Sequence, residues 1–168
     1  MRFELSQAQK QKYKEEGMLV VDGLFPQELH AHLIDSAQGI NQFQFSRELE
    51  KILTFRGLGE ILHELTQARP IRLVYSQVFE KSHLDFRHLP FQGLLIAIVI
   101  PFQENRTTIF AINSDYVVSE KSLVAVYGEN STLLVKGKHN HELYQLYTRK
   151  GYGSGDRLKS LDSPFVYR

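Results

Sequence analysis

The sequence predicts an α+β fold in which a helical N-terminal third precedes a β-rich core. Up to residue 67, apolar residues recur at helical spacing. From residue 70 onward, short runs rich in Val, Ile, Phe and Tyr follow one another between Pro, Asn, Gly and charged residues. Such closely spaced strands favour an antiparallel sandwich or jelly roll, because parallel strands would need crossover helices for which there is no room.

Length and composition favour one domain spanning residues 1–168. The chain has 42% hydrophobic and 23% charged residues, which is ordinary for a globular protein with one substantial core. We expect residues 1–67 to form a mainly helical part that packs on a sheet formed by residues 70–168. The chain has no Cys, which excludes disulfides and thiolate metal sites and leaves His, Asp and Glu as metal ligands.

The first two helices are predicted from local signals. Ser6 and Gln9 form a capping box and Gly17 is a natural C-terminal residue, so a polar helix is expected over 7–16. A short buried strand over 18–25 follows, and Pro26 then opens a helix whose apolar stripe comprises Leu29, Leu33, Ile34 and Ala37. His30 and His32 lie two apart on this helix and are interpreted as surface or boundary residues.

Residues 46–67 predict one or two further helices, broken near Gly57 and Gly59. His63 and Glu64 begin a metalloprotease-like HExxH helix, but residue 67 is Gln, so the second zinc ligand is missing. The predicted strands begin with 71–80 and a central strand at 93–102, which is apolar on both faces. The others are 107–113, 115–119, 122–128, 131–137 and 142–149.

His83, Leu84 and Asp85 form an HxD motif between two predicted strands. Residues two apart on an extended backbone point to the same side, so an imidazole and a carboxylate could hold one face of a metal ion. A third ligand from a distant histidine would complete a facial triad for non-haem iron. A chain of this composition contains a chance HxD about one time in four, so the surrounding pattern has to carry the interpretation.

That surrounding pattern resembles the phytanoyl-CoA dioxygenase group. The resemblance rests on LSQAQKQKYKEEGMLVVDGLFPQELHAHL at the N-terminus, on VYSQVFEKSHLDF around the HxD, and on LLIAIVIPFQENRTTIFAIN after it. The group belongs to the Fe(II)- and 2-oxoglutarate-dependent oxygenases. The resemblance therefore implies a double-stranded β-helix core, a relative of the jelly roll, with Fe(II) and 2-oxoglutarate as cofactors.

The same resemblance implies a set of site residues. His83 and Asp85 would bind the iron together with His141, for which His139 is the alternative. Arg149 and Lys150 would bind 2-oxoglutarate. The chain departs from the group at residues 111–115, where AINSD replaces a Pro-Gly-Ser-His-like element, and it is much shorter than typical members.

The charge distribution leaves two interpretations of the C-terminal fifth. Residues 136–168 carry seven Lys or Arg against three acidic residues, a local net charge of +4 in a chain whose total is +1. This surplus is either a solvated basic face or an anion-binding pocket for a small dicarboxylate; a phosphate-backbone contact is less favoured. The small total charge argues against nucleic acid as a partner.

Three functional classes remain open from the sequence. The first is a small Fe(II)/2-oxoglutarate oxygenase that hydroxylates an unknown small-molecule substrate. The second is a degenerate, inactive member of that fold that binds a small molecule or an unknown protein. The third is a divalent-metal-responsive regulator.

The sequence predicts a cytoplasmic protein without a membrane segment, because it has no apolar run of ~18 residues and its N-terminus is polar. It does not define the oligomeric state.

Overall fold

The computed structural model describes residues 4–36, 39–136 and 141–168. Its main sheet has six strands in the order β1-β5-β4-β7-β2-β8, and neighbouring strands are antiparallel. The six strands are β1 (Met18–Asp22), β2 (Ile71–Phe79), β4 (Phe91–Pro101), β5 (Arg106–Ala111), β7 (Ser122–Leu134) and β8 (Phe165–Tyr167). A separate two-stranded sheet pairs β3 (Ser82–Leu84) with β6 (Tyr116–Val118).

In the described ranges, five α-helices and two 3-10 helices accompany the sheets. They are α1 (Gln7–Glu16), α2 (Gln27–Ser36), η1 (Gln42–Gln44), α3 (Arg47–Leu53), α4 (Arg56–Thr66), η2 (Phe86–His88) and α5 (His141–Arg149). This mixture of helices with a curled antiparallel sheet supports the α+β prediction. The first third is not purely helical, because β1 pairs with β5 at one edge of the main sheet.

The local signals at α1 are confirmed. The Ser6 hydroxyl accepts a hydrogen bond from the Gln9 backbone N–H at 3.1 Å, and the Ser6 N–H donates to Gln9 Oε1 at 2.8 Å. Gly17 adopts φ 69°, a left-handed conformation that glycine reaches without strain, and its N–H donates to the Tyr13 carbonyl. These hydrogen bonds provide partners for backbone groups at both helix ends that lack one within the helix. The helix spans the predicted residues.

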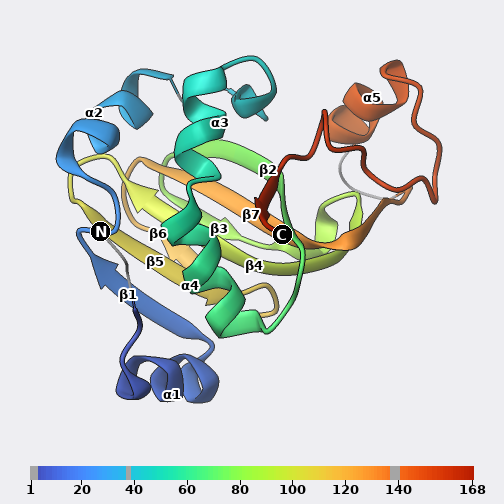
Figure 1. Cartoon of the computed structure of the whole chain (residues 1–168). Helices are drawn as coiled ribbons and strands as arrows, with labels where there is room; N and C mark the ends of the chain where they lie inside the picture. Colours follow the sequence, from blue (N-terminus) through green and yellow to red (C-terminus); the bar gives the residue numbers. More distant parts are fainter. Residues whose placement is uncertain (1–3, 37–38, 137–140) are drawn as a thin grey trace.

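The main sheet separates two hydrophobic cores. On one face, alternate residues of β4 such as Ile96 and Ile98 pack against buried side chains of α2, α3 and α4. We call this the first core, and Figure 1 shows α3 and α4 running across that face. On the other face, Ala97 and Val99 meet β3, η2, β6, α5 and the segment after α5, which contributes Tyr152 and Leu158. We call this the second core. The alternation follows from the strand period of two, and the predicted central position of this strand is confirmed.

Three element predictions are wrong. Residues 142–149 form α5 and not a strand, with Leu143 and Tyr147 buried one helical turn apart in the second core. Residues 122–134 form the single strand β7 instead of two strands. The break between α3 and α4 lies at Thr54 and Phe55, and both glycines lie inside α4.

Two smaller predictions have partial outcomes. His32 is exposed as expected, whereas His30 is buried and its Nε2 lies 2.7 Å from the Pro101 carbonyl oxygen. In the predicted stripe of α2, Leu33 is buried and Leu29 is half-buried, while Ala37 and the side chain of Ile34 lie outside the described residues. No helix in the described ranges is long and apolar enough to cross a membrane.

Candidate functional site

The HxD motif lies on the small sheet and at its edge. His83 is the middle residue of β3, opposite Val117 of β6, and its side chain is exposed. Leu84 turns into the second core, and Asp85 follows the strand as a half-buried residue that caps η2. The motif therefore stands where a short strand gives way to a helical turn.

His83 and Asp85 line one cavity of about 310 Å³. Its walls come from β2, β3 and η2, and they combine aromatic rings with polar groups. The lining residues are Tyr75, Gln77, Phe79, His83, Leu84, Asp85, Phe86, His88 and Leu89. The Tyr75 hydroxyl donates a hydrogen bond to Gln77 Oε1 within this wall. Burial raises the pKa of the Tyr75 phenol above its ordinary value, so the hydroxyl stays protonated.

The Asp85 carboxylate is held by Arg87 in a two-point contact. Arg87 Nε donates to Oδ1 at 2.8 Å and Nη2 donates to Oδ2 at 2.8 Å, while the Arg87 backbone N–H adds a third bond to Oδ1 at 3.0 Å. His88 Nε2 lies 3.3 Å from Oδ2. The hydrogen bonds from the Arg87 side chain and backbone hold the pKa of the Asp85 carboxyl well below its usual range. Both oxygens are thus already engaged by a permanent cation.

The strand beside β3 brings a second carboxylate and no imidazole. Tyr116 pairs with Leu84, so the preceding residue, Asp115, stands next to the end of β3 that carries Asp85. The charge of Asp115 contributes to raising the pKa of Arg87. Segment 112–119 contains no histidine. The position across the small sheet from the HxD therefore adds an acidic side chain.

The predicted distal histidines fall where side chains are not described. His139 lies outside the described residues. His141 is the first residue of α5, and its side chain lies outside them too. Their role as iron ligands stays a prediction.

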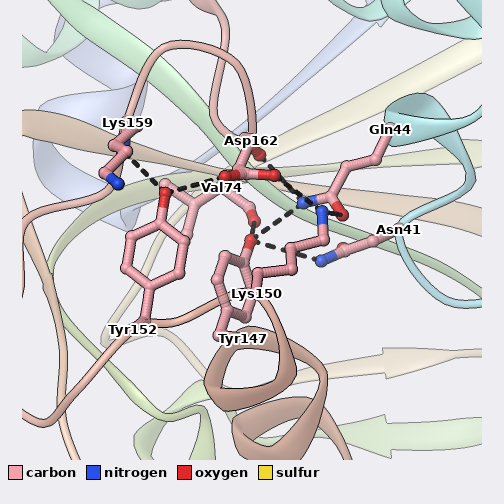
Figure 2. Close-up of polar contacts among 8 residues, drawn as sticks. All are labelled: Asn41, Gln44, Val74, Tyr147, Lys150, Tyr152, Lys159 and Asp162. Atoms are coloured by element: carbon pink, nitrogen blue, oxygen red, sulfur yellow. Dashed lines mark hydrogen bonds and ion pairs between the residues drawn. The ribbon is translucent and has the colours of Figure 1, made fainter.

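The predicted 2-oxoglutarate residues, Arg149 and Lys150, do not line the cavity of the HxD motif. Lys150 Nζ donates to Asp162 Oδ1 at 2.6 Å and to Gln44 Oε1 at 2.8 Å. Figure 2 shows these two bonds of Lys150 within a network that also includes Tyr147 and Tyr152. No residue of this network lines the cavity at His83 and Asp85. Arg149 ends α5 with an exposed side chain.

The described side chains do not fit a three-ligand iron site. A carboxylate binds a metal ion through oxygen lone pairs, and Arg87 donates to both oxygens of Asp85 and places a positive charge beside them. Within the described part of the chain, no three His, Asp or Glu side chains lie close enough together to hold a metal ion. The residue missed from the sequence is Arg87, and its signal was the D-x-R spacing, which lets an arginine after a strand end reach back to the carboxylate.

Comparison with known proteins gives the fold. No family model matches the chain, and no curated protein matches it in sequence. The structure of the non-haem α-ketoglutarate-dependent carbocyclase SnoK from nogalamycin biosynthesis is similar over 96% of this chain and 96% of that chain, with a TM-score of 0.78 and 13% identity. The epimerase SnoN, solved with Fe³⁺, α-ketoglutarate and nogalamycin RO, is similar over 95% of this chain and 98% of that chain, with a TM-score of 0.64 and 12% identity.

A third similar structure is CT296 from Chlamydia trachomatis. It matches 76% of this chain and 97% of that chain, with a TM-score of 0.56 and 16% identity. Identities this low show the fold alone. The chain therefore has a fold like that of the non-haem α-ketoglutarate-dependent enzymes, and its resemblance to the phytanoyl-CoA dioxygenase group stays a prediction.

Proposed function

We propose that this chain is a binding protein built on an oxygenase-like fold, and that it does not carry out iron-dependent turnover. One observation supports this above the others: the two-point contact of Arg87 with both oxygens of Asp85. A bidentate arginine–carboxylate pair is among the strongest hydrogen-bonded contacts between side chains. A metal ion that binds Asp85 would have to displace Arg87 or bind against its positive charge.

The proposed binding site is the cavity at His83 and Asp85. Its volume of about 310 Å³ lies at the lower end of the range typical of small-molecule sites. The rings of Tyr75, Phe79 and Phe86 supply apolar contact area, while His83 and His88 supply polar groups. A small organic molecule with an apolar body and one or two polar groups would suit this lining.

The experiment uses anaerobic protein with Fe(II) and 2-oxoglutarate. We expect no visible charge-transfer absorbance that depends on 2-oxoglutarate. The matched pair of variants is His83→Ala and His32→Ala, because both histidines are exposed and only His83 lines the cavity. A band in the wild type that His83→Ala abolishes and His32→Ala retains would overturn the proposal.

A second pair of variants tests whether Arg87 is what opposes metal binding at Asp85. Arg87→Gln removes the cation that holds Asp85, and Arg106→Gln removes an equivalent surface cation whose Nε lies 2.9 Å from Asp22 Oδ1. We expect Arg87→Gln to bind Mn(II) more tightly than the wild type in a calorimetric titration and Arg106→Gln to leave Mn(II) binding unchanged. Equal Mn(II) binding by all three proteins would show that Arg87 is not the obstacle.

The alternative function is an active Fe(II)/2-oxoglutarate oxygenase. It is favoured by the shared cavity of His83 and Asp85, together with the fold similarity to α-ketoglutarate-dependent enzymes. The absorbance experiment separates the two functions, since only the oxygenase requires the 2-oxoglutarate-dependent band. Its substrate would be the molecule that the cavity admits.

A further inference from the structure

Arg72 is a buried cation whose hydrogen-bond partners are all neutral. Only 5% of the residue is exposed. Its Nη1 donates to the Ser163 carbonyl oxygen at 2.9 Å, and its Nε and Nη2 donate to Asn130 Oδ1 at 3.3 and 3.1 Å. The Phe165 ring lies 4.1 Å from its central carbon. A guanidinium has five N–H groups, so these three bonds leave part of its donor capacity unused.

The surroundings of Arg72 add more positive charge. Burial is the main cause that lowers the pKa of Arg72, and the charge of Arg157 lowers it further. Arg168 lies against the same Phe165 ring as Arg72, with its central carbon 5.0 Å from the ring centre. We call Arg72, Arg157 and Arg168 the arginine cluster. Arg157 and Arg168 are exposed, so the cluster extends from a buried residue to the solvent.

The acidic residues near the arginine cluster are engaged elsewhere. Asp162 uses one oxygen for Lys150 and the other for the Tyr152 hydroxyl, as Figure 2 shows. Asp156 Oδ2 accepts the Gly153 N–H at 2.7 Å. Across residues 4–36, 39–136 and 141–168, none of the three arginines forms a salt bridge with an acidic side chain.

A buried charge without a counter-charge is costly, and the neutral oxygens of Ser163 and Asn130 do not supply one. A planar guanidinium with spare N–H groups, within reach of the charge of Arg157, suits the paired oxygens of a carboxylate or phosphate. We propose that Arg72 and Arg157 form a binding site for a small oxyanion. Arg168 adds positive charge at its rim. The site lies where β2 meets β8 and is separate from the cavity at His83 and Asp85.

The test is a titration followed by NMR of the arginine Nε–H groups at constant ionic strength. One arm uses inorganic phosphate and the other uses succinate, so that a phosphate ligand and a carboxylate ligand are distinguished. We expect one of the two anions to shift the Arg72 and Arg157 signals in a saturable way. Saturation with phosphate alone assigns a phosphate site, and saturation with succinate alone assigns a carboxylate site.

The variants are Arg157→Gln and the matched control Arg47→Gln. Both residues are exposed, so neither substitution threatens the fold, whereas replacing the buried Arg72 could. We expect Arg157→Gln to weaken anion binding tenfold or more, and Arg47→Gln to change it less than about twofold. Shifts that never saturate with either anion, or equal effects of the two substitutions, would overturn the proposal. The His83 absorbance experiment does not involve this site, so the two proposals fail independently.

Discussion

Tyr152 connects two parts of the C-terminal segment through one hydroxyl group. The hydroxyl donates to Asp162 Oδ2 at 2.8 Å and accepts the Lys159 backbone N–H at 3.0 Å, while the ring packs edge-on against Tyr147 in the second core. Asp162 in turn holds Lys150. At the scale of single residues, this small network fixes the segment that follows α5 against the sheet.

Removing that hydroxyl should destabilise the protein. Tyr152→Phe keeps the ring but leaves Asp162 Oδ2 and the Lys159 N–H each without a bond. We expect the free energy of unfolding to fall by about 1–3 kcal/mol, measured by urea denaturation. Tyr144→Phe is the matched control, because Tyr144 is a half-buried residue of the adjoining α5 whose hydroxyl bonds to none of the described residues. It should change the free energy of unfolding by less than about 0.5 kcal/mol. Equal effects would show that the two bonds contribute nothing.

Two tyrosines with raised pKa values also predict a loss of stability in alkali. Burial raises the pKa of Tyr152 to about 12 and that of Tyr13 to about 12, against an ordinary value near 10. The folded state therefore keeps these protons where the unfolded chain has begun to lose them. Stability should be fully present below about pH 10 and should fall as the pH rises toward 12.

The alkaline prediction is measured by urea denaturation at about pH 9 and about pH 11, with tyrosinate absorbance followed in parallel. Tyr152→Phe removes one of the shifted groups, so its stability should fall less between the two pH values than that of the wild type. An unchanged wild-type stability across this interval would contradict the assigned burial of the phenols.

At the scale of elements, the close approach of α4 to β8 depends on Gly59. A Cβ placed on Gly59 would lie 2.2 Å from the Val166 carbonyl oxygen, and a backbone atom cannot move aside cheaply. Gly57, in the same helix, would place its Cβ 2.8 Å from the end of the Phe55 ring, which can rotate away. The two glycines therefore have different roles despite their proximity.

Gly59→Ala should displace α4 from the sheet. We expect it to reduce the free energy of unfolding by about 1–3 kcal/mol, the usual cost of overpacking. The free energy of unfolding of Gly57→Ala should stay within about 1 kcal/mol of the wild-type value, because the gain in helix propensity offsets the cost of moving the Phe55 ring. Thermal denaturation of both variants tests this, and a Gly59→Ala protein as stable as the wild type would contradict the close contact.

Elements with local signals could be predicted from the sequence, and elements fixed by tertiary contacts could not. The α1 boundaries follow from Ser6, Gln9 and Gly17, whose hydrogen bonds form within the helix itself. The segment 142–149 is rich in Tyr and Thr, which favour strands. It is a helix because Leu143 and Tyr147, four residues apart, are both buried in the second core.

The candidate site could also be predicted only in part from the sequence. The HxD spacing predicts that His83 and Asp85 share a side, and both line the cavity. The engagement of Asp85 by Arg87 depends on the turn into η2, which no spacing rule specifies. The burial of Arg72 could have been suspected, because this charged residue lies within an otherwise apolar strand start; its neutral partners, from residues 130 and 163, could not.

At the scale of the whole molecule, one sheet serves both cores. Strand β4 gives Ile96, Ile98 and Ile100 to the first core and Ala97 and Val99 to the second. Loss of the sheet would expose both cores at once. The helices of the first core and α5 of the second are thus coupled through the strands between them, and Figure 1 shows α5 standing apart from α3 and α4.

This coupling predicts a single unfolding transition, as expected of one domain. Leu62→Ala in the first core and Leu158→Ala in the second remove fully buried side chains, so each should reduce the free energy of unfolding by about 2–5 kcal/mol. Far-UV circular dichroism and tyrosine fluorescence should report the same urea midpoint in each variant. Leu161→Ala is the matched control, since Leu161 is 90% exposed in the same C-terminal segment and should leave the midpoint unchanged. If Leu158→Ala instead separated the two signals, the segment between α5 and β8 would unfold independently, and Arg157 would lie on a part of the chain that can open while Arg72 stays in the sheet.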